Sequence, residues 1–140
     1  MSVISTRLQS LHHIGVIVQD LDATIAWYER HLGFAVLTTF AFPGARVAFI
    51  GRGEVKLELF QIDGAAPMAP ERKEALTNLR IGGINHFAIL VDDIEATLAE
   101  LQENGVEQAY PISDVPDGSG DRWVFIRDNE GMLIELYQPA

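Results

Sequence analysis

The segment HHIGVIVQDLDATIAWYE at residues 12–29 returns later in the chain as NHFAILVDDIEATLAELQ at residues 85–102, and the two segments align without a gap. This alignment places His13 opposite His86. Similarity of a chain to itself at a fixed spacing marks a structural unit that has been duplicated. The sequence therefore predicts two copies of one module, each beginning near a histidine.

A second pair of similar segments marks the end of each copy. KLELFQ at residues 56–61 matches LIELYQ at residues 133–138, and Glu58 lies opposite Glu135. One histidine and one glutamate therefore stand at equivalent places in each copy, and a single duplication relates the two pairs.

Each copy has the pattern of a strand, a helix and three further strands. Asp20 has the position of a helix N-cap, and Gly33 follows the last helical residue, where glycine is favoured. Asp93 and Gly105 take the same places in the second copy. Isoleucine and valine are frequent in the first strand, as expected for β-structure. The predicted strands cover residues 11–19, 34–41, 45–51 and 54–61 in the first copy and 84–91, 107–111, 122–127 and 132–138 in the second.

This order of elements predicts an α+β fold with two βαβββ modules in tandem and curved mixed sheets. The first module spans about residues 10–62 and the second about residues 84–138. The connection, residues 63–83, carries a short helical run near 71–79. Because neither module could bury its own sheet alone, we expect a single domain over residues 1–140.

Strand alternation predicts which face of each sheet carries these histidines and glutamates. Side chains alternate between the two faces of a strand, so spacing decides which residues share a surface. His13 shares a face with Gly15 and Ile17, and the bulkier residues between them suit the face under the helix. Glu58 stands between two leucines that suit the same helix-covered face. The histidine and glutamate of each copy are therefore expected on the face away from the helices.

A shared metal ion explains why carboxylates stand in the middle of apolar strands. Burying a carboxylate is costly unless it is paired or bound to a cation. The chain has no cysteine, so imidazole and carboxylate are the ligands that it can offer. We predict one divalent metal ion per site, and the ligand types allow Ni²⁺, Co²⁺, Zn²⁺, Mn²⁺ or Fe²⁺. The predicted ligands are His13, Glu58, His86 and Glu135.

Composition narrows the range of partners. The chain has 10 basic and 20 acidic residues, and its net charge of −10 disfavours nucleic acid and anionic membrane surfaces. Hydrophobic residues make up 48% of the chain, which indicates a globular protein. The first ten residues do not have the pattern of a secretory signal, so a cytoplasmic location is the expectation.

Four segments together resemble the vicinal oxygen chelate superfamily, over about residues 10–138. The resemblance implies two βαβββ modules whose curved sheets enclose a metal-binding pocket, commonly in a homodimer. In the glyoxalase I branch each module supplies one histidine and one glutamate, and these positions fall on the four predicted ligands. The segments that carry the resemblance are HHIGVIVQDLDATIAWYERHLGF, VKLELFQ, INHFAILVDDIEATLAELQENGV and VFIRDNEGMLIELYQ.

The resemblance implies a glyoxalase I-like lyase or isomerase acting on a small molecule, an α-hydroxycarbonyl or hemithioacetal, through an enediolate. By the same resemblance, Glu135 is the expected proton-transferring base, and Glu58 is a second catalytic candidate that serves mainly as a ligand. Ile17 and Ile62 stand where bacterial glyoxalase I enzymes carry polar residues. This departure argues against glutathione as part of the substrate.

Three alternatives remain open from the sequence. A methylmalonyl-CoA epimerase usually has glutamine in place of Glu58 and a further glutamate base in the first module, whereas residues 38–50 contain no carboxylate. A ring-cleaving dioxygenase binds Fe²⁺ with two histidines and one glutamate, so Glu58 as a fourth ligand counts against it. A ligand-sequestering protein of the bleomycin-resistance type lacks the full ligand set. The metal, the substrate, and whether one chain or a dimer completes the site also stay open.

Overall fold

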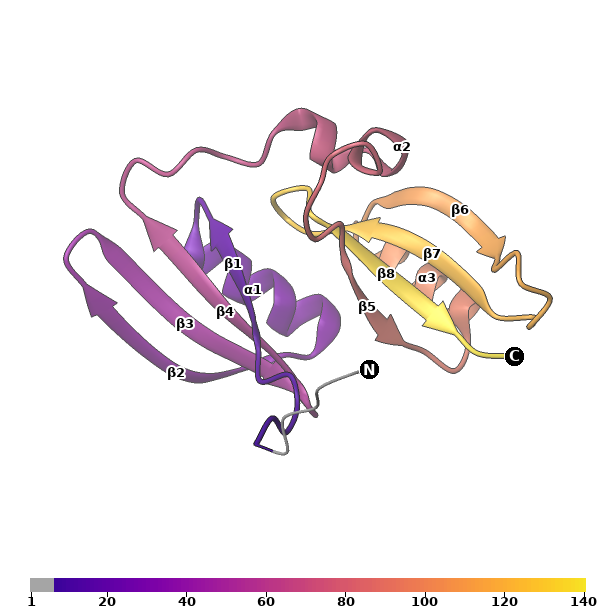
Figure 1. Ribbon diagram of the computed structural model, residues 1–140, viewed down its shortest axis with the longest axis horizontal. Coiled ribbons are helices and arrows are strands. Elements are labelled where there is room, and N and C mark those ends of the chain that lie inside the picture. Colours follow the sequence, from indigo (N-terminus) through magenta and orange to yellow (C-terminus); the bar gives the residue numbers. More distant parts are fainter. Residues whose placement is uncertain (1–6) are drawn as a thin grey trace.

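The computed structural model describes residues 7–140 and consists of two four-stranded sheets, each covered by one helix (Figure 1). The strand orders are β1-β4-β3-β2 and β5-β8-β7-β6. The predicted α+β fold of two tandem βαβββ modules is confirmed. The first module contains β1 (Ile14–Val18), α1 (Leu21–Leu32), β2 (Ala35–Phe42), β3 (Ala45–Arg52) and β4 (Val55–Ile62), and the second contains β5 (Phe87–Leu90), α3 (Ile94–Glu103), β6 (Gln108–Asp114), β7 (Arg122–Arg127) and β8 (Leu133–Gln138).

Both sheets are mixed for the same topological reason. The first strand of each module runs parallel to the last, so that β1 pairs with β4 and β5 pairs with β8. The other neighbouring strands are antiparallel. A parallel pair needs a long crossover connection, and here the helix and two strands supply it.

The predicted helix caps are present. The Asp20 carboxylate accepts a hydrogen bond from the Ala23 amide at 2.9 Å, and the Asp93 carboxylate accepts the equivalent bond from Ala96. Gly33 ends α1 with φ of 68°, a left-handed conformation that glycine adopts without the steric cost of a side chain. Both modules therefore begin their helices by the same local interaction.

The first strand of each module begins later than the sequence predicted. The ladder between β1 and β4 starts at Ile14, and the ladder between β5 and β8 starts at Phe87. Each first strand is an edge strand with one partner, so it extends only as far as that partner's ladder. His13 and His86 consequently stand just before their strands. The predicted helical run in the connection is shorter and divided, with η1 at Pro70–Lys73 and α2 at Ala75–Asn78.

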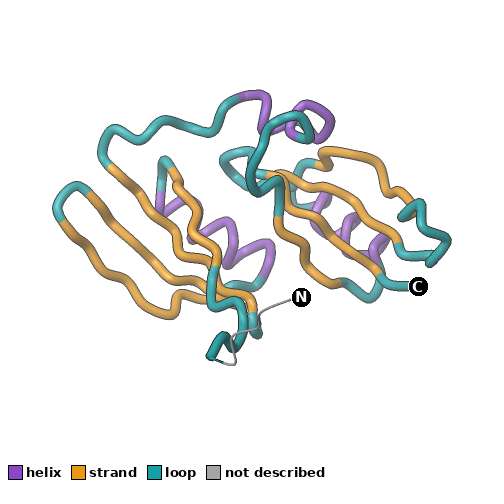
Figure 2. The backbone as a smooth tube through the Cα atoms, viewed as in Figure 1, coloured by secondary structure: helices purple, strands orange, loops and turns teal. Residues whose placement is uncertain are grey.

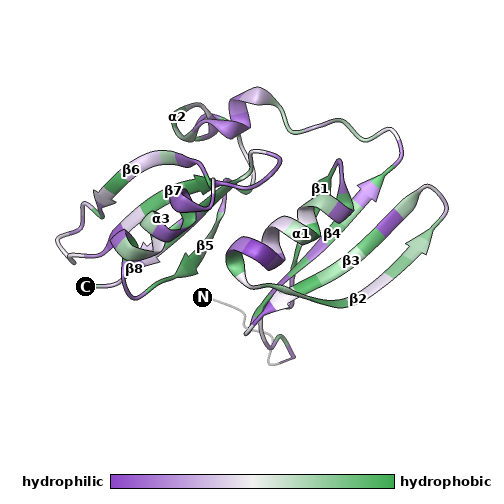
Figure 3. Cartoon of the chain, turned by 180° about the vertical axis from the view of Figure 1, so that it is seen from behind, coloured by the Kyte–Doolittle hydropathy of each residue, from purple (hydrophilic) through white to green (hydrophobic). Residues whose placement is uncertain are grey.

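The helices cover the same side of both sheets. Figure 3, which views the molecule from behind, shows α1 and α3 in front of the strands, with hydrophilic stretches turned outward. Leu57 and Leu59 on β4, and Ile134 on β8, are fully buried under these helices. Buried residues of the two modules form one continuous cluster that includes Tyr28 from α1 and Leu98 from α3. The opposite face of the first sheet carries no helix, whereas Ala75 of the short helix α2 packs against Phe125 and Leu133 on the opposite face of the second sheet.

The turn between β7 and β8 joins the second module to the first helix. Figure 2 shows this loop reaching toward the first module. The hydroxyl of buried Tyr28 donates a hydrogen bond to Asp128 at 2.8 Å. The Glu130 carboxylate accepts hydrogen bonds from the backbone amides of Gln19 and Asp20, where α1 begins. We call Tyr28, Asp128 and Glu130 the intermodule clamp.

Within residues 7–140, no helix is both long enough and apolar enough to cross a membrane. The longest helix, α1, has 12 residues and carries charged side chains along its exposed side. A membrane-spanning helix needs about 20 mainly apolar residues.

The clamp predicts a pH dependence of stability. Burial raises the pKa of Asp128 above its ordinary value of 3.8, although hydrogen bonds from two backbone amides and Tyr28 oppose this effect. The folded state therefore binds a proton more readily than the unfolded state does. As pH rises from below 3.8 through the raised pKa, the wild type should lose free energy of unfolding relative to Asp128→Asn. Urea unfolding between pH 3.5 and 7 measures this difference, and exposed Asp92→Asn should show no comparable trend.

Candidate functional site

The first predicted pair comes together on the helix-free face of the first sheet. His13 precedes β1 and Glu58 lies on β4, with 3.7 Å between His13 Nε2 and Glu58 Oε2. The Glu58 side chain is 14% exposed, so it is largely shielded from water but reachable from this face. Phe49, opposite Glu58 on β3, packs edge-on against the imidazole with ring centroids 5.0 Å apart.

The second module repeats this arrangement. His86 Nε2 contacts Glu135 Oε2, and the Glu135 side chain is 13% exposed. Phe125 stands opposite Glu135 on β7 and packs against the imidazole of His86, with centroids 4.7 Å apart. Each module therefore carries a half-site made of one histidine, one glutamate and one phenylalanine.

A neighbouring residue contacts Nδ1 of each imidazole. His86 Nδ1 lies 2.7 Å from Asn85 Oδ1, and an amide oxygen can only accept, so Nδ1 carries the proton. Nε2, the other ring nitrogen of His86, lies on the side of Glu135. His12 holds the place of Asn85 in the first module, with 2.8 Å between its Nδ1 and that of His13. Histidines that bind metals usually have such a partner, which fixes the ring and its tautomer.

Sequence reasoning missed the two phenylalanines, Asn85 and the contact of His12. Phe49 and Phe125 look like ordinary strand residues, yet each faces the glutamate of its own module across a ladder. Their equivalence in the duplication was a usable signal. Strand alternation would put His12 and His13 on opposite faces, so it gave no sign of this contact. The alternation fails there because residues 12 and 13 precede the first ladder position, Ile14.

The structure does not gather all four predicted ligands into one cluster. Among residues 7–140, no three histidine, aspartate or glutamate side chains are grouped closely enough to hold one metal ion. The two half-sites belong to different modules, and Figure 1 shows β1 and β5 running in opposite directions on the facing sides of the two modules. A cavity of about 580 Å³ is lined by His13 and Lys56 from the first module and by Phe87 and Ala88 from the second.

The residues of the half-sites fit a divalent metal chemically. Imidazole nitrogen and carboxylate oxygen together suit Zn²⁺, Ni²⁺, Co²⁺, Mn²⁺ and Fe²⁺. The shielded position of each carboxylate also favours a cation, because an uncompensated charge in this position is costly. Lys56 lies two residues before Glu58 on the same strand face, so this face already combines a cation with a carboxylate.

Comparison with known proteins identifies the family. The sequence pattern of the Glyoxalase/Bleomycin resistance protein/Dioxygenase superfamily matches residues 10–136, and the chain belongs to this superfamily. Members of the superfamily typically bind a divalent metal, and glyoxalase I and epimerases are among its enzymes. The resemblance drawn from the repeated segments is thereby confirmed.

Individual relatives cover nearly the whole chain. The human mitochondrial methylmalonyl-CoA epimerase is 31% identical over 138 residues, which cover 94% of this chain and 75% of that protein. The crystal structure of a glyoxalase family protein from Enterococcus faecalis superimposes with a TM-score of 0.74 at 29% identity, covering 92% and 97% of the two chains. The glyoxalase I of Leishmania major gives a TM-score of 0.68 at 28% identity, covering 94% and 87%.

The half-sites predict a specific metal stoichiometry. If both half-sites bind the same ion, protein purified without chelator should contain about one divalent metal per chain, and His86→Ala should lose most of it. Two independent half-sites would instead bind up to two ions per chain. Elemental analysis distinguishes these outcomes, and His31→Ala, which changes a histidine at the end of α1, is the matched control. Full metal content in both His13→Ala and His86→Ala would contradict the assignment of these ligands.

Proposed function

We propose that this protein is a divalent-metal-dependent lyase or isomerase of the glyoxalase I kind, acting on a small α-hydroxycarbonyl or hemithioacetal. The observation that carries the proposal is the pair of equivalent half-sites, each on the face of its sheet away from α1 or α3. His13, Glu58, His86 and Glu135 would hold the metal, with Asn85 orienting one imidazole. The chain belongs to a superfamily that includes metal-dependent enzymes, and this membership supports the same function.

The proposed site is completed within one chain. β1 and β5 are the edge strands on the facing sides of the two sheets, and residues from the beginning of both line one cavity. No ladder of hydrogen bonds joins the two sheets, since each forms a separate four-stranded sheet. A movement of one module against the other at this junction could therefore bring the half-sites together without breaking any strand pairing. Four ligands from one chain then give one metal per chain.

The two glutamates would have different roles in the reaction. When bound, the metal would supply positive charge to two neighbouring oxygens of the substrate and so acidify the adjacent C–H bond. Glu135 would take this proton and return it to the neighbouring carbon. Its 13% exposure limits proton exchange with bulk water, and Phe125 restricts its movement on one side. Glu58 would remain mainly a ligand.

An epimerase is the second candidate, and the identity with human methylmalonyl-CoA epimerase favours it. Both reactions begin with removal of a proton next to a carbonyl, so the same base can serve either. They differ in where the proton returns: to the same carbon in an epimerase and to the neighbouring carbon in an isomerase. Product analysis by NMR after reaction in deuterated water separates the two candidates.

The proposal includes a homodimer of such chains. Leu76 and Leu79 near α2, and Ile84 just before β5, are large apolar side chains that are exposed in the single chain. Contact with a second copy would remove these side chains from water, which is favourable. Sedimentation equilibrium measures the oligomeric state directly.

The assignment of the base predicts an asymmetry between the two glutamates. Glu135→Gln keeps the size of the side chain and an oxygen ligand but loses most of its basicity. Its kcat should fall by about 10²–10⁴ while it retains part of its metal, as expected when a general base is lost. Glu58→Gln should lose less. The measurement is turnover of both variants with metal content determined in parallel, and a metal-loaded Glu135→Gln enzyme of near-normal rate would refute the role.

Mixing two inactive variants tests whether one chain completes the site. If it does, every chain of His13→Ala and every chain of His86→Ala carries one damaged half-site, and mixed dimers should remain inactive. If half-sites of different chains combined instead, a mixed dimer would contain one intact site. Random exchange would then restore about a quarter of wild-type activity.

The exchange must be verified for this test to be decisive. Denaturing and refolding the two variants together, each with a different affinity tag, allows the mixed dimer to be isolated. Wild-type protein treated in the same way controls for recovery. Activity in the isolated mixed dimer would overturn the single-chain site while leaving the metal ligands themselves unchanged.

A further inference from the structure

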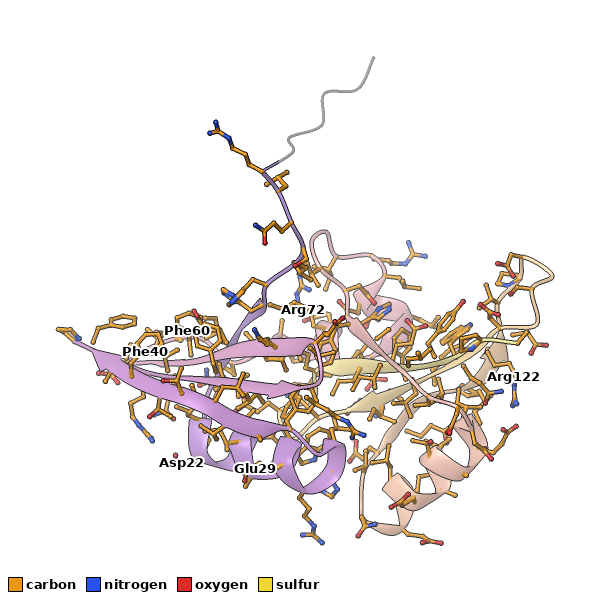
Figure 4. All side chains as sticks on the ribbon, turned by 90° about the horizontal axis from the view of Figure 1, so that it is seen from below. Asp22, Glu29, Phe40, Phe60, Arg72 and Arg122 are labelled. Atoms are coloured by element: carbon orange, nitrogen blue, oxygen red, sulfur yellow. The ribbon has the colours of Figure 1, made fainter. Side chains whose placement is uncertain are left out.

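An apolar row crosses the helix-free face of the first sheet beside the half-site. Ile17 on β1 stands opposite Phe60 on β4, Phe60 opposite Val47 on β3, and Val47 opposite Phe40 on β2. Residues that face one another across a ladder lie on the same side of the sheet. Figure 4 shows Phe40 and Phe60 on the side opposite Asp22 and Glu29, which belong to α1. We call these four residues the apolar row.

The apolar row is partly open to the surroundings. Ile17 is 54% exposed and Phe40 is 45% exposed, whereas Val47 is buried beneath its neighbours in the row. The next row along the sheet, formed by Ile62, Ala45 and Phe42, is apolar as well. Exposed apolar side chains that adjoin one another commonly mark a binding surface.

The apolar row is continuous with the half-site. Phe60 lies two residues after Glu58 on β4, a separation of about 6–7 Å along a strand. The rings of His13, Phe49 and Phe40 form a chain of contacts, with centroids 5.0 Å and then 6.4 Å apart. A molecule whose oxygens reach the metal ligands would therefore extend its next few carbon atoms over Phe60 and Phe40.

Charged groups lie elsewhere on this sheet. Lys56 is on the opposite side of Glu58 from Phe60, because it precedes Glu58 by two residues. Arg46 is bound to Asp22 on the helix side, with 2.8 Å between its Nη2 and the carboxylate. No positively charged group of the described chain therefore stands in the apolar row. A charged substituent placed there would lose water without gaining a partner.

The equivalent row of the second module is chemically different. It contains Leu90, Tyr137, Trp123 and Ser113. The Tyr137 hydroxyl donates to Asp121 at 2.5 Å, and the Trp123 indole stacks on Tyr110 at 5.3 Å. In this row Tyr137 carries a hydrogen-bonded hydroxyl, and Trp123 is already stacked on Tyr110. The row of the first module, in contrast, consists of hydrocarbon alone.

From these observations we infer that the first module holds an uncharged aryl or similarly bulky apolar substituent of the substrate. This inference rests on the proposed function and specifies its substrate class: a compound with two neighbouring oxygens and an apolar group attached directly beside them. Ile17, Phe60 and Phe40 contact that group, and the oxygens lie toward His13 and Glu58. Small substrates such as methyl-substituted compounds leave the row uncovered.

Two hydroxamic acids test the inference without knowledge of the natural substrate. Benzohydroxamic acid and acetohydroxamic acid both bind a metal through two neighbouring oxygens, and they differ in carrying a phenyl or a methyl group. Isothermal titration of zinc-loaded protein should give about tenfold or more tighter binding of the phenyl compound, after correction for their affinities for free Zn²⁺. Phe40→Ala and Phe60→Leu should each reduce this preference, with little change for the methyl compound.

The controls separate this inference from the proposed function. Val36→Ala removes an exposed apolar side chain of β2 that stands opposite Ile50, outside the apolar row, and should keep the preference. Equal binding of the two compounds, or a preference that survives both phenylalanine variants, would overturn the inference alone. Failure of both compounds to bind zinc-loaded protein would overturn the metal site and the inference together. If Phe40→Ala changed only the oligomeric state, the row would be a contact between chains and the inference would be wrong.

Discussion

The parallel pairing of the first and last strands is the interaction on which each half-site depends. His13 and Glu58, like His86 and Glu135, are far apart along the chain, and only the pairing of β1 with β4 and of β5 with β8 makes them neighbours. The register fixes Gly15 opposite Glu58 and Ala88 opposite Glu135. A small residue at each of these positions leaves room beside the carboxylate. A shift of one residue would turn both glutamates toward the helices.

Most of the fold could be predicted because the two-residue alternation of strands and the helical spacing of apolar residues occur in the same order in both copies. The position of each glutamate on the face away from α1 or α3 followed from strand alternation. The separation of the half-sites did not, because alternation describes one sheet and contains no information on how two sheets meet. Phe49 and Phe125 were missed for a related reason: a phenylalanine in a strand has the same appearance in sequence whether it fills a core or supports a ligand.

The two modules carry the same histidine, glutamate and phenylalanine, but the residues beside these three differ between the modules. Each keeps the contact between a histidine, a glutamate and a phenylalanine. The rows beside these residues have diverged, with hydrocarbon around Phe60 and hydrogen-bonded or stacked rings around Tyr137. The proposed single site between the modules would therefore be asymmetric, and an asymmetric substrate would bind in one orientation.

The intermodule clamp has a consequence beyond stability. It joins the modules on the helix side, through Tyr28, Asp128 and Glu130, while the sheets meet without hydrogen bonds on the ligand side. The clamp and the shared core hold the two modules at one angle, and this angle sets how far apart the half-sites lie. In the proposed function, part of the free energy of metal binding would be used to change this angle, which would lower the observed affinity. The metal affinity of the proposed site would therefore be partly determined on the face of the molecule where none of the proposed ligands lies.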